Sequence, residues 1–184
     1  MDSFIIHLPD FRVVVCKKCQ YAILPSQIDA HFKPRKSTRS KKPAKQLHGV
    51  GKDLCERIKR DVAKVEGLIP NPEALKECEF SFPPSTAGPI SALGDPEKNG
   101  LRCTAKVEGQ ECGYICCSLQ FMQRHYEVEH QWKNEQKGRP KKGVEHNVPW
   151  RTGIHCQRFF KQGHKSQYFE VQPIYPSIDG SHQG

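Results

Sequence analysis

Two sets of cysteine and histidine residues, one near each end of the chain, constrain its fold more than any other sequence feature. The second set has the spacing Cys103-x8-Cys112-x12-His125-x4-His130. Its cysteines precede a predicted helix, and both histidines belong to that helix. Two thiolates followed by two imidazoles in this order are typical of a structural zinc finger. We therefore predict that these four residues bind one Zn²⁺.

The segment between the two cysteines of this set is longer than in most fingers. Eight residues (TAKVEGQE) stand where about two to four are common, so we expect an enlarged loop that turns at Gly109. The small core of the finger then includes Cys116 and Met122, and we predict that both are buried. An alternative for Cys116 and the adjacent Cys117 is a pair of spare ligands or a redox couple.

The first set has the spacing Cys16-x2-Cys19-x11-His31. Ile23 and Ile28 occupy the two positions that a finger uses for its apolar core. These matches predict three ligands of a second structural Zn²⁺ site. The alternative is an ordinary pair of cysteines in a strand turn.

The fourth ligand of this first site must lie further along the chain, because no histidine follows His31 within five residues. Sixteen residues separate His31 from His48. The entropy of closing a loop grows only slowly with its length, so this separation does not prevent a shared metal ion. We predict His48 as the fourth ligand, with Cys55 as its main rival.

The composition argues against one large hydrophobic core. Only 36% of the residues are apolar and the mean hydropathy is -0.70, which favours small units stabilised by a metal ion or by disulfides. The nine cysteines are an odd number and the first residues lack the pattern of a secretory signal, so we expect reduced thiols. No segment is apolar over the roughly 18 residues that a bilayer requires, so no membrane partner is expected.

Local patterns predict short strands and helices. The helix over 51–66 rests on apolar residues at helical intervals before Gly67, and Asn71 and Ser118 are predicted N-caps. The expected elements are strands at 11–15, 21–24 and 113–116 and helices at 27–32, 51–66, 72–78 and 119–131.

We therefore predict an α+β chain of two small ββα-like zinc units joined by a helix and a Pro-rich linker, with no single large core. The predicted segments are an N-terminal zinc-finger unit with a basic insertion (8–50), an amphipathic helix and Pro-rich linker (51–100), a zinc finger (101–132), a basic linker (133–147), an aromatic β-hairpin (148–172) and a disordered tail (173–184). The aromatic residues expected to pack from the hairpin against the second finger are Trp150, Phe159, Phe160, Tyr168 and Phe169.

The chain is basic, with a net charge of +9 and a pI near 9.1, which favours nucleic acid, and DNA first, as a partner. Residues 33–46 hold seven basic residues and no acidic one. Residues 137–142 (KGRPKK) resemble an AT-hook core, whose Gly-Arg-Pro unit lies in a narrow minor groove, although a nuclear localisation signal or a solvated linker is the alternative. The predicted contacts are Arg35, Lys36, Arg39, Lys41, Lys42, Arg124, Lys137, Arg139, Lys141 and Lys142.

Base reading by the finger helices is not expected. At the helix positions that read bases, only Gln27, Ser118 and Arg124 carry side chains that can hydrogen-bond to a base edge. Two fingers separated by a long linker also cannot follow one groove as a compact array. The sequence therefore favours contacts with phosphates over sequence-specific readout.

No motif in the sequence predicts catalysis. His155 and Cys156 are adjacent in a predicted strand, so their side chains point to opposite faces and His155 cannot activate the thiol. Cys156 is better explained as a core residue of the hairpin. The chain has no phosphate loop, nucleophile elbow or catalytic zinc pattern, and we predict a non-enzymatic protein.

Several segments between about Leu8 and Val171 resemble the fungal OrsD family, named after orsellinic acid biosynthesis cluster protein D. They are LPDFRVVVCKKCQYAILPSQIDAHF, LRC, ECGYICC, MQRHYEVEHQW and VPWRTGIHCQRFFKQGHKSQYFEV. The resemblance implies zinc fingers at the same cysteine and histidine positions, and a basic insertion that displaces the second histidine of the first finger to His48. It also implies a DNA-associated setting, because such domains stand at the front of helicase-like and mobile-element-related fungal proteins.

These features predict a nuclear zinc-binding protein associated with DNA or chromatin. One alternative is a zinc-stabilised interaction module that contacts a protein partner through its aromatic hairpin. Another is an accessory factor of fungal secondary metabolism. Salt-sensitive binding to DNA favours the first function, and salt-insensitive binding to a protein favours the second.

Overall fold

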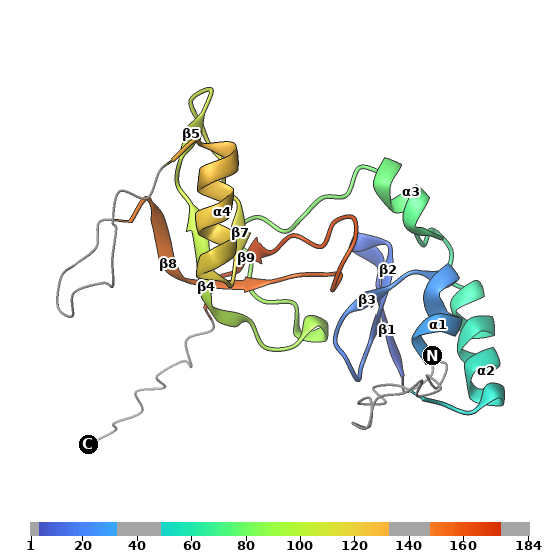
Figure 1. Cartoon of the computed structure of the whole chain (residues 1–184). Helices are drawn as coiled ribbons and strands as arrows, with labels where there is room; N and C mark the ends of the chain where they lie inside the picture. The colour runs from blue at the N-terminus through green and yellow to red at the C-terminus, as the bar shows by residue number, and fades with distance from the viewer. Residues whose placement is uncertain (1–3, 33–48, 133–147, 174–184) are drawn as a thin grey trace, which may run out of the picture. The chain divides into compact units, whose positions relative to one another are not determined.

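The computed structural model describes residues 4–32, 49–132 and 148–173 (Figure 1). These residues form an α+β fold with antiparallel sheets, as predicted. The predicted basic insertion, the AT-hook-like segment and the tail from residue 174 onward lie outside them. In the part of the chain that is described, no helix is both long enough and apolar enough to span a membrane.

The chain divides into two compact units, which are described one at a time. The first unit comprises residues 1–82, 90–94 and 158–167. The second unit comprises residues 83–89, 95–157 and 168–184.

The first unit contains a three-stranded antiparallel sheet in the order β1-β2-β3, formed by β1 (Ile5–Leu8), β2 (Val13–Cys16) and β3 (Ala22–Ile23). The 3₁₀ turn η1 (Pro9–Phe11) joins the first two strands. β2 and β3 are the two strands that the sequence predicted. β1 was not predicted, because its four residues show no apolar-polar alternation that marks an isolated strand.

Three helices follow this sheet. The 3₁₀ turn η2 (Pro25–Gln27) leads into α1 (Ile28–Phe32), and α2 (Lys52–Ala63) lies beside α1 (Figure 1). The predicted N-cap of α3 (Pro72–Glu77) is confirmed, since the Asn71 side chain accepts a hydrogen bond of 2.8 Å from the Ala74 backbone. The buried core that sheet and helices share consists of Ile5, Val14, Cys16, Ile23, Ile28, Phe32, Cys55, Ile58 and Val62.

A cluster of phenylalanines also belongs to the first unit. The ring of Phe159 lies 4.6 Å from that of Phe11 and 5.2 Å from that of Phe80, measured between centroids. The Phe159 carbonyl also accepts a hydrogen bond of 2.7 Å from the Ala22 backbone. The prediction that Phe159 and Phe160 pack against the second finger was therefore wrong. They belong to the first unit because the chain after Gln157 leaves the second unit's sheet.

The 3₁₀ turn η3 (Ser91–Leu93) belongs to the first unit and precedes β4 in the chain. The second unit is built on a four-stranded antiparallel sheet in the order β7-β4-β8-β9. Its strands are β4 (Glu97–Cys103), β7 (Ile115–Cys116), β8 (Trp150–Gln157) and β9 (Phe169–Glu170). β8 and β9 pair as the predicted hairpin does, but β8 also pairs with β4 from Glu97 to Cys103. The hairpin is thus part of the same sheet that carries Cys103.

The enlarged loop of the second set is a small hairpin of its own. β5 (Lys106–Val107) pairs with β6 (Gln110–Glu111), and the turn between them has positive φ at Glu108 (51°) and Gly109 (85°). This is the turn chemistry that Gly109 predicted. The helix α4 (Leu119–Glu129) then covers β4 and β7 (Figure 1), with Met122 and Tyr126 buried against the sheet.

Candidate metal centres

The second unit brings together all four residues of the second predicted set. The ligand atoms of Cys103, Cys112, His125 and His130 all lie within 4.8 Å of one another. Nε2 of His130 is 3.3 Å from the sulfur of Cys103, and Nε2 of His125 is 3.4 Å from the sulfur of Cys112. The two histidine nitrogens are 3.2 Å apart. Four convergent donors therefore surround one point.

Different elements supply these four ligands. Cys103 is the last residue of β4 and is fully buried, and Cys112 directly follows β6. His125 lies on α4, and His130 directly follows the helix. The β5–β6 hairpin closes on itself, since the Cys112 backbone donates a hydrogen bond of 2.8 Å to the Ala105 carbonyl. For this reason the long spacing between the cysteines does not separate their sulfur atoms.

The geometry and chemistry of this group fit a zinc ion. Two sulfurs and two imidazole nitrogens are a donor set typical of tetrahedral structural zinc. With zinc–sulfur bonds of about 2.3 Å and zinc–nitrogen bonds of about 2.0 Å, a tetrahedral site has sulfur–nitrogen separations of about 3.5 Å. The separations of 3.3 and 3.4 Å are close to that value.

The electrostatic setting of these groups also favours a metal ion. Burial, and then the neighbouring His130, lowers the pKa of His125, so the imidazole stays neutral and keeps a lone pair for a metal. Burial raises the pKa of Cys103, although the nearby Tyr126 hydroxyl opposes this. A buried thiol of this kind loses its proton when a cation compensates the thiolate charge, which couples metal binding to proton release.

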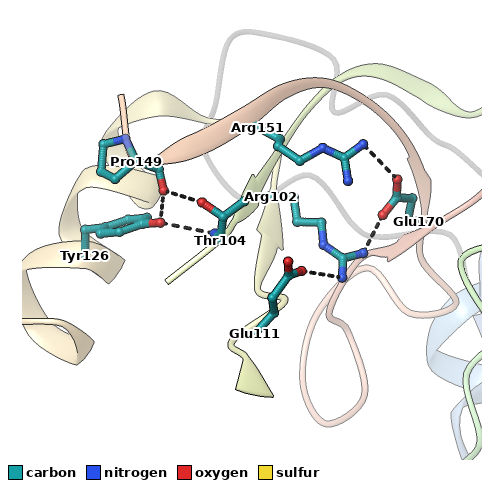
Figure 2. A network of polar contacts seen from close by, with 7 residues as sticks. All are labelled: Arg102, Thr104, Glu111, Tyr126, Pro149, Arg151 and Glu170. Atoms are coloured by element: carbon teal, nitrogen blue, oxygen red, sulfur yellow. Dashed lines mark hydrogen bonds and ion pairs between the residues drawn. The ribbon is translucent and has the colours of Figure 1, made fainter. Parts of the chain in front are cut away.

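Tyr126 connects the helix to the sheet beside the cluster (Figure 2). Its hydroxyl accepts a hydrogen bond of 3.1 Å from the Thr104 backbone and donates one to the Pro149 carbonyl. The Thr104 hydroxyl donates to the same carbonyl at 2.9 Å. Because Thr104 directly follows Cys103, these contacts fix α4 relative to the strand end that carries a ligand. No sequence pattern indicated this role, apart from the position of Tyr126 next to His125.

An ionic network supports the hairpin that carries Cys112 (Figure 2). Arg102 on β4 contacts Glu170 on β9, and its second nitrogen lies 3.4 Å from a carboxylate oxygen of Glu111 on β6. Arg151 on β8 lies 3.9 Å from the other oxygen of Glu170. Glu111 directly precedes Cys112, so the network restrains the approach of that ligand. Spacing along the chain could not predict it, because its members come from four strands.

The first unit brings together the three clear residues of the first set. The ligand atoms of Cys16, Cys19 and His31 lie within 4.8 Å of one another, and the Cys19 sulfur is 3.7 Å from Nε2 of His31. Cys16 ends β2, and the tight turn after it has a backbone hydrogen bond of 2.7 Å from Gln20 to Cys16. A hydrogen bond from the Cys19 thiol lowers the pKa of Cys16, and the same contact raises the pKa of Cys19.

Of the two candidates for the fourth ligand of the first set, only Cys55 lies within the described residues. His48 lies outside the described residues. Cys55 is buried in the same core as Cys16, but it does not belong to the group of close ligand atoms. Its sulfur instead lies 3.5 Å from a carboxylate oxygen of Asp29. Burial, and then Asp29, raises the pKa of Cys55, which keeps this thiol protonated.

Of the ten residues predicted to contact nucleic acid, Arg124 is the one that falls within the described ranges. It is exposed on α4, as is Phe121, which stands one helical turn before it. The other nine lie outside the described residues: Arg35, Lys36, Arg39, Lys41, Lys42, Lys137, Arg139, Lys141 and Lys142.

The chain matches a known protein family. Residues 3–131 match the model of the OrsD family, described as orsellinic acid/F9775 biosynthesis cluster protein D. The chain belongs to the OrsD family. The match ends directly after His130, so every clustered ligand of both units lies within the segment that OrsD proteins share.

A curated relative carries the same description. It is the orsellinic acid/F9775 biosynthesis cluster protein D of Emericella nidulans, which is 27% identical over 163 residues. The alignment covers 89% of this chain and 25% of the relative, so the chain spans about a quarter of that OrsD protein's length. No solved structure matches the chain.

Proposed function

We propose that this chain is a non-enzymatic zinc protein of the OrsD family that associates with nucleic acid, most simply DNA, in the nucleus. The observation that carries the proposal is the four-donor group in the second unit. Four protein ligands fill a tetrahedral zinc site and leave no position for water or substrate, which is the arrangement of structural and not catalytic zinc. The ion would hold the β4 end, the β5–β6 hairpin and α4 together as a ββα-like finger.

A second structural zinc ion is proposed for the first unit. Cys16, Cys19 and His31 supply three donors from a strand end, a turn and a short helix. We propose His48 as the fourth, because the sulfur of Cys55 is engaged with Asp29. Zinc analysis of the purified full chain tests both sites: two ions per chain support the proposal, and one or none contradicts it.

The support for nucleic acid is the charge of the chain. The net charge is +9, and basic residues concentrate in the two segments that follow Phe32 and Trp132. Such residues contact phosphates and release counterions, so binding weakens as salt rises. Phe121 stands where a base-reading side chain would be in a DNA-binding finger, and its side chain is 62% exposed. We therefore propose contacts with phosphates and the minor groove.

Binding of duplex DNA at several salt concentrations tests this part of the proposal. We expect affinity to fall at least about tenfold between about 50 and about 200 mM salt. Neutralising the second basic segment should weaken binding more than removing the same charge from α2. The segment variant carries glutamine at Lys137, Arg139, Lys141 and Lys142, and the control carries it at Lys52, Arg57, Arg60 and Lys64, which are exposed on or beside α2. Equal losses of DNA affinity in the two variants, or DNA binding that does not depend on salt, would count against the proposed role of the basic segment.

The second candidate function is a zinc-stabilised module that binds a protein. It is favoured by α4, on which Leu119, Phe121 and Val128 are 53%, 62% and 65% exposed. Phe121 and Val128 lie on the same side of α4, and exposed apolar side chains on one side of a helix can mark a protein-interaction site. The name of the Emericella nidulans relative adds secondary metabolism as the setting of an accessory factor. Binding of a protein partner that persists at high salt and is lost in Phe121→Ser supports this alternative.

A further inference from the structure

Two cysteines outside both metal clusters face each other in the second unit. The sulfur atoms of Cys117 and Cys156 are 3.6 Å apart. Cys117 lies in the short connection between β7 and α4, and Cys156 lies on β8. The two residues are 39 positions apart in the sequence, so this contact is a product of the fold.

The sheet contains a gap that makes this contact possible. β4 lies between β7 and β8 in the sheet, and the residue of β4 at this point is Gly100, which pairs with Ile154. A Cβ atom at Gly100 would lie 2.9 Å from the sulfur of Cys156 and 2.5 Å from the Ile154 carbonyl oxygen. The missing side chain on the central strand leaves room for the Cys156 sulfur to reach toward Cys117.

The remaining cysteines outside the clusters are directed at oxygen atoms. Cys116 lies 3.3 Å from the Ser118 carbonyl, Cys78 lies 3.5 Å from the Leu75 carbonyl, and Cys55 faces Asp29. In contrast, the sulfur atoms of Cys117 and Cys156 contact each other. This arrangement is the one from which a disulfide forms.

We propose that Cys117 and Cys156 are a redox modification site that forms a reversible disulfide with hydrogen peroxide as the oxidant. The Cys117 thiolate attacks one peroxide oxygen, the O–O bond breaks, and Cys117 becomes a sulfenic acid while hydroxide leaves. The Cys156 sulfur then attacks the Cys117 sulfur and displaces its oxygen. The two thiol protons end in water, so that two thiols and one peroxide give one disulfide and two water molecules.

The two cysteines differ in exposure, which assigns their roles. Cys117 is partly exposed, whereas Cys156 has 0% of its surface exposed. A small oxidant therefore reaches Cys117 first. Burial, and then the adjacent Cys117, raises the pKa of Cys156. Cys156 therefore acts second, once Cys117 has been oxidised.

A disulfide requires the sulfurs to approach from 3.6 Å to about 2.05 Å. Cys117 and Ser118 lie between the end of β7 and the first residue of α4, outside the strand pairing and outside the helix. Cys117 is not among the paired residues of β7, so its side chain can move toward Cys156 without the loss of a strand hydrogen bond. The covalent link would tie the start of α4 to β8.

The link would strengthen the second unit without using a metal ligand. It closes a loop that contains α4 with His125 and His130, while all four clustered ligands stay available. Closing a loop of this length reduces the entropy of the unfolded chain, so the oxidised protein resists unfolding better than the reduced one. Dithiothreitol would return it to the reduced state.

Peptide mapping of the zinc-loaded full chain tests the proposal directly. The chain is treated with hydrogen peroxide, its remaining thiols are alkylated, and it is digested without reduction. We expect one major cross-linked product that joins Cys117 to Cys156 and disappears with dithiothreitol. A product that joins Cys116 to Cys117 or to Cys156, or oxidation of other cysteines while this pair stays reduced, overturns the proposal. This measurement needs no variant.

Thermal unfolding supplies a second readout with matched variants. Peroxide should raise the Tm of the wild-type chain by roughly 5 °C or more, reversibly. Cys117→Ser should abolish the rise, and Cys78→Ser, which removes a partly buried cysteine of the first unit, should keep it. A rise that persists in Cys117→Ser, or no rise in a chain whose cross-link has been mapped, would contradict the proposed stabilising link.

Discussion

The two cysteine-histidine clusters resemble each other in layout and differ in where the chain carries extra residues. In both, a cysteine ends a strand and a histidine lies on the helix that follows. In the second unit the extra residues lie between the two cysteines and fold into the β5–β6 hairpin, which returns the chain to the cluster. In the first unit the extra residues lie between His31 and His48.

The second unit shows how an insertion can leave a ligand cluster intact. A hairpin within the cysteine pair satisfies its own backbone hydrogen bonds and holds its two ends close together. In the first unit, sixteen residues separate the proposed fourth ligand, His48, from His31 in the sequence. The second cluster is therefore complete among the described residues, and the first shows three donors.

The two clusters also differ in what supports them. The second has a smaller apolar core, in which Cys103 packs with Cys116, Met122, Tyr126 and Trp150, and it is flanked by polar contacts of Tyr126 and Arg102. In the first, Cys16 belongs to an apolar core to which α2 contributes Ile58 and Val62. Apolar burial stabilises a fold without a metal ion. We therefore expect the second cluster to depend on its ion more than the first does.

The largest effect should come from His125→Ala. The variant should lose one zinc ion per chain and much of the stability of the second unit, because a structural zinc site contributes folding free energy directly. Zinc analysis and the near-ultraviolet circular dichroism of Trp132 and Trp150, which both pack near the cluster, measure this loss. His155→Ala is the matched control, since His155 lies on β8 outside the cluster. Unchanged zinc content in His125→Ala would refute the four-ligand site.

The next effect should come from His48→Ala, which removes the proposed fourth ligand of the first cluster. We expect zinc content to fall from two ions to one, with a smaller loss of stability than for His125→Ala, because the apolar core of the first unit remains. Cys55→Ala is the control and should retain both ions, because its sulfur contacts Asp29. If zinc is instead lost in Cys55→Ala and kept in His48→Ala, Cys55 and not His48 is the fourth ligand.

A smaller effect is expected for Tyr126→Phe. The variant keeps the buried ring but loses the hydroxyl that contacts Thr104 and Pro149, so the strand end that carries Cys103 becomes less fixed. Zinc affinity of the second site, measured by competition with a chelator, should fall by about 10- to 100-fold. Tyr114→Phe is a suitable control, because it preserves the ring that stacks on His125 at 4.1 Å. Equal affinities of all three proteins would show that the hydroxyl does not position the ligand.

The smallest effect should come from Lys59→Ala. Lys59 forms an ion pair of 2.6 Å with Asp29 that joins α2 to α1 near the first cluster. Water and salt weaken such an exposed pair, so we expect Tm to change by no more than about 2 °C and zinc content to stay at two. Loss of an ion in this variant would show that the first cluster depends on the contact between the helices. That result would weaken the contrast drawn between the two units.

Much of the candidate site followed from the sequence because its signals are local. Cysteine pairs, a helical histidine and the apolar positions Ile23, Ile28 and Met122 occur at fixed spacings within one strand–turn–helix segment. These three apolar residues are buried, as expected. The turn at Gly109 and the cap at Asn71 were likewise predictable, because each depends on the conformation of a few neighbouring residues.

Contacts between distant segments were decided by the tertiary structure alone. Three such contacts leave no pattern in neighbouring residues. They are the pairing of β4 with β8, the placement of Phe159 in the first unit, and the approach of Cys117 to Cys156 beside Gly100. Spacing along the chain specifies which side chains a turn or a helix presents. Which of those side chains meet is decided by how sheets pair and where glycine leaves space, and these depend on residues far apart in the sequence.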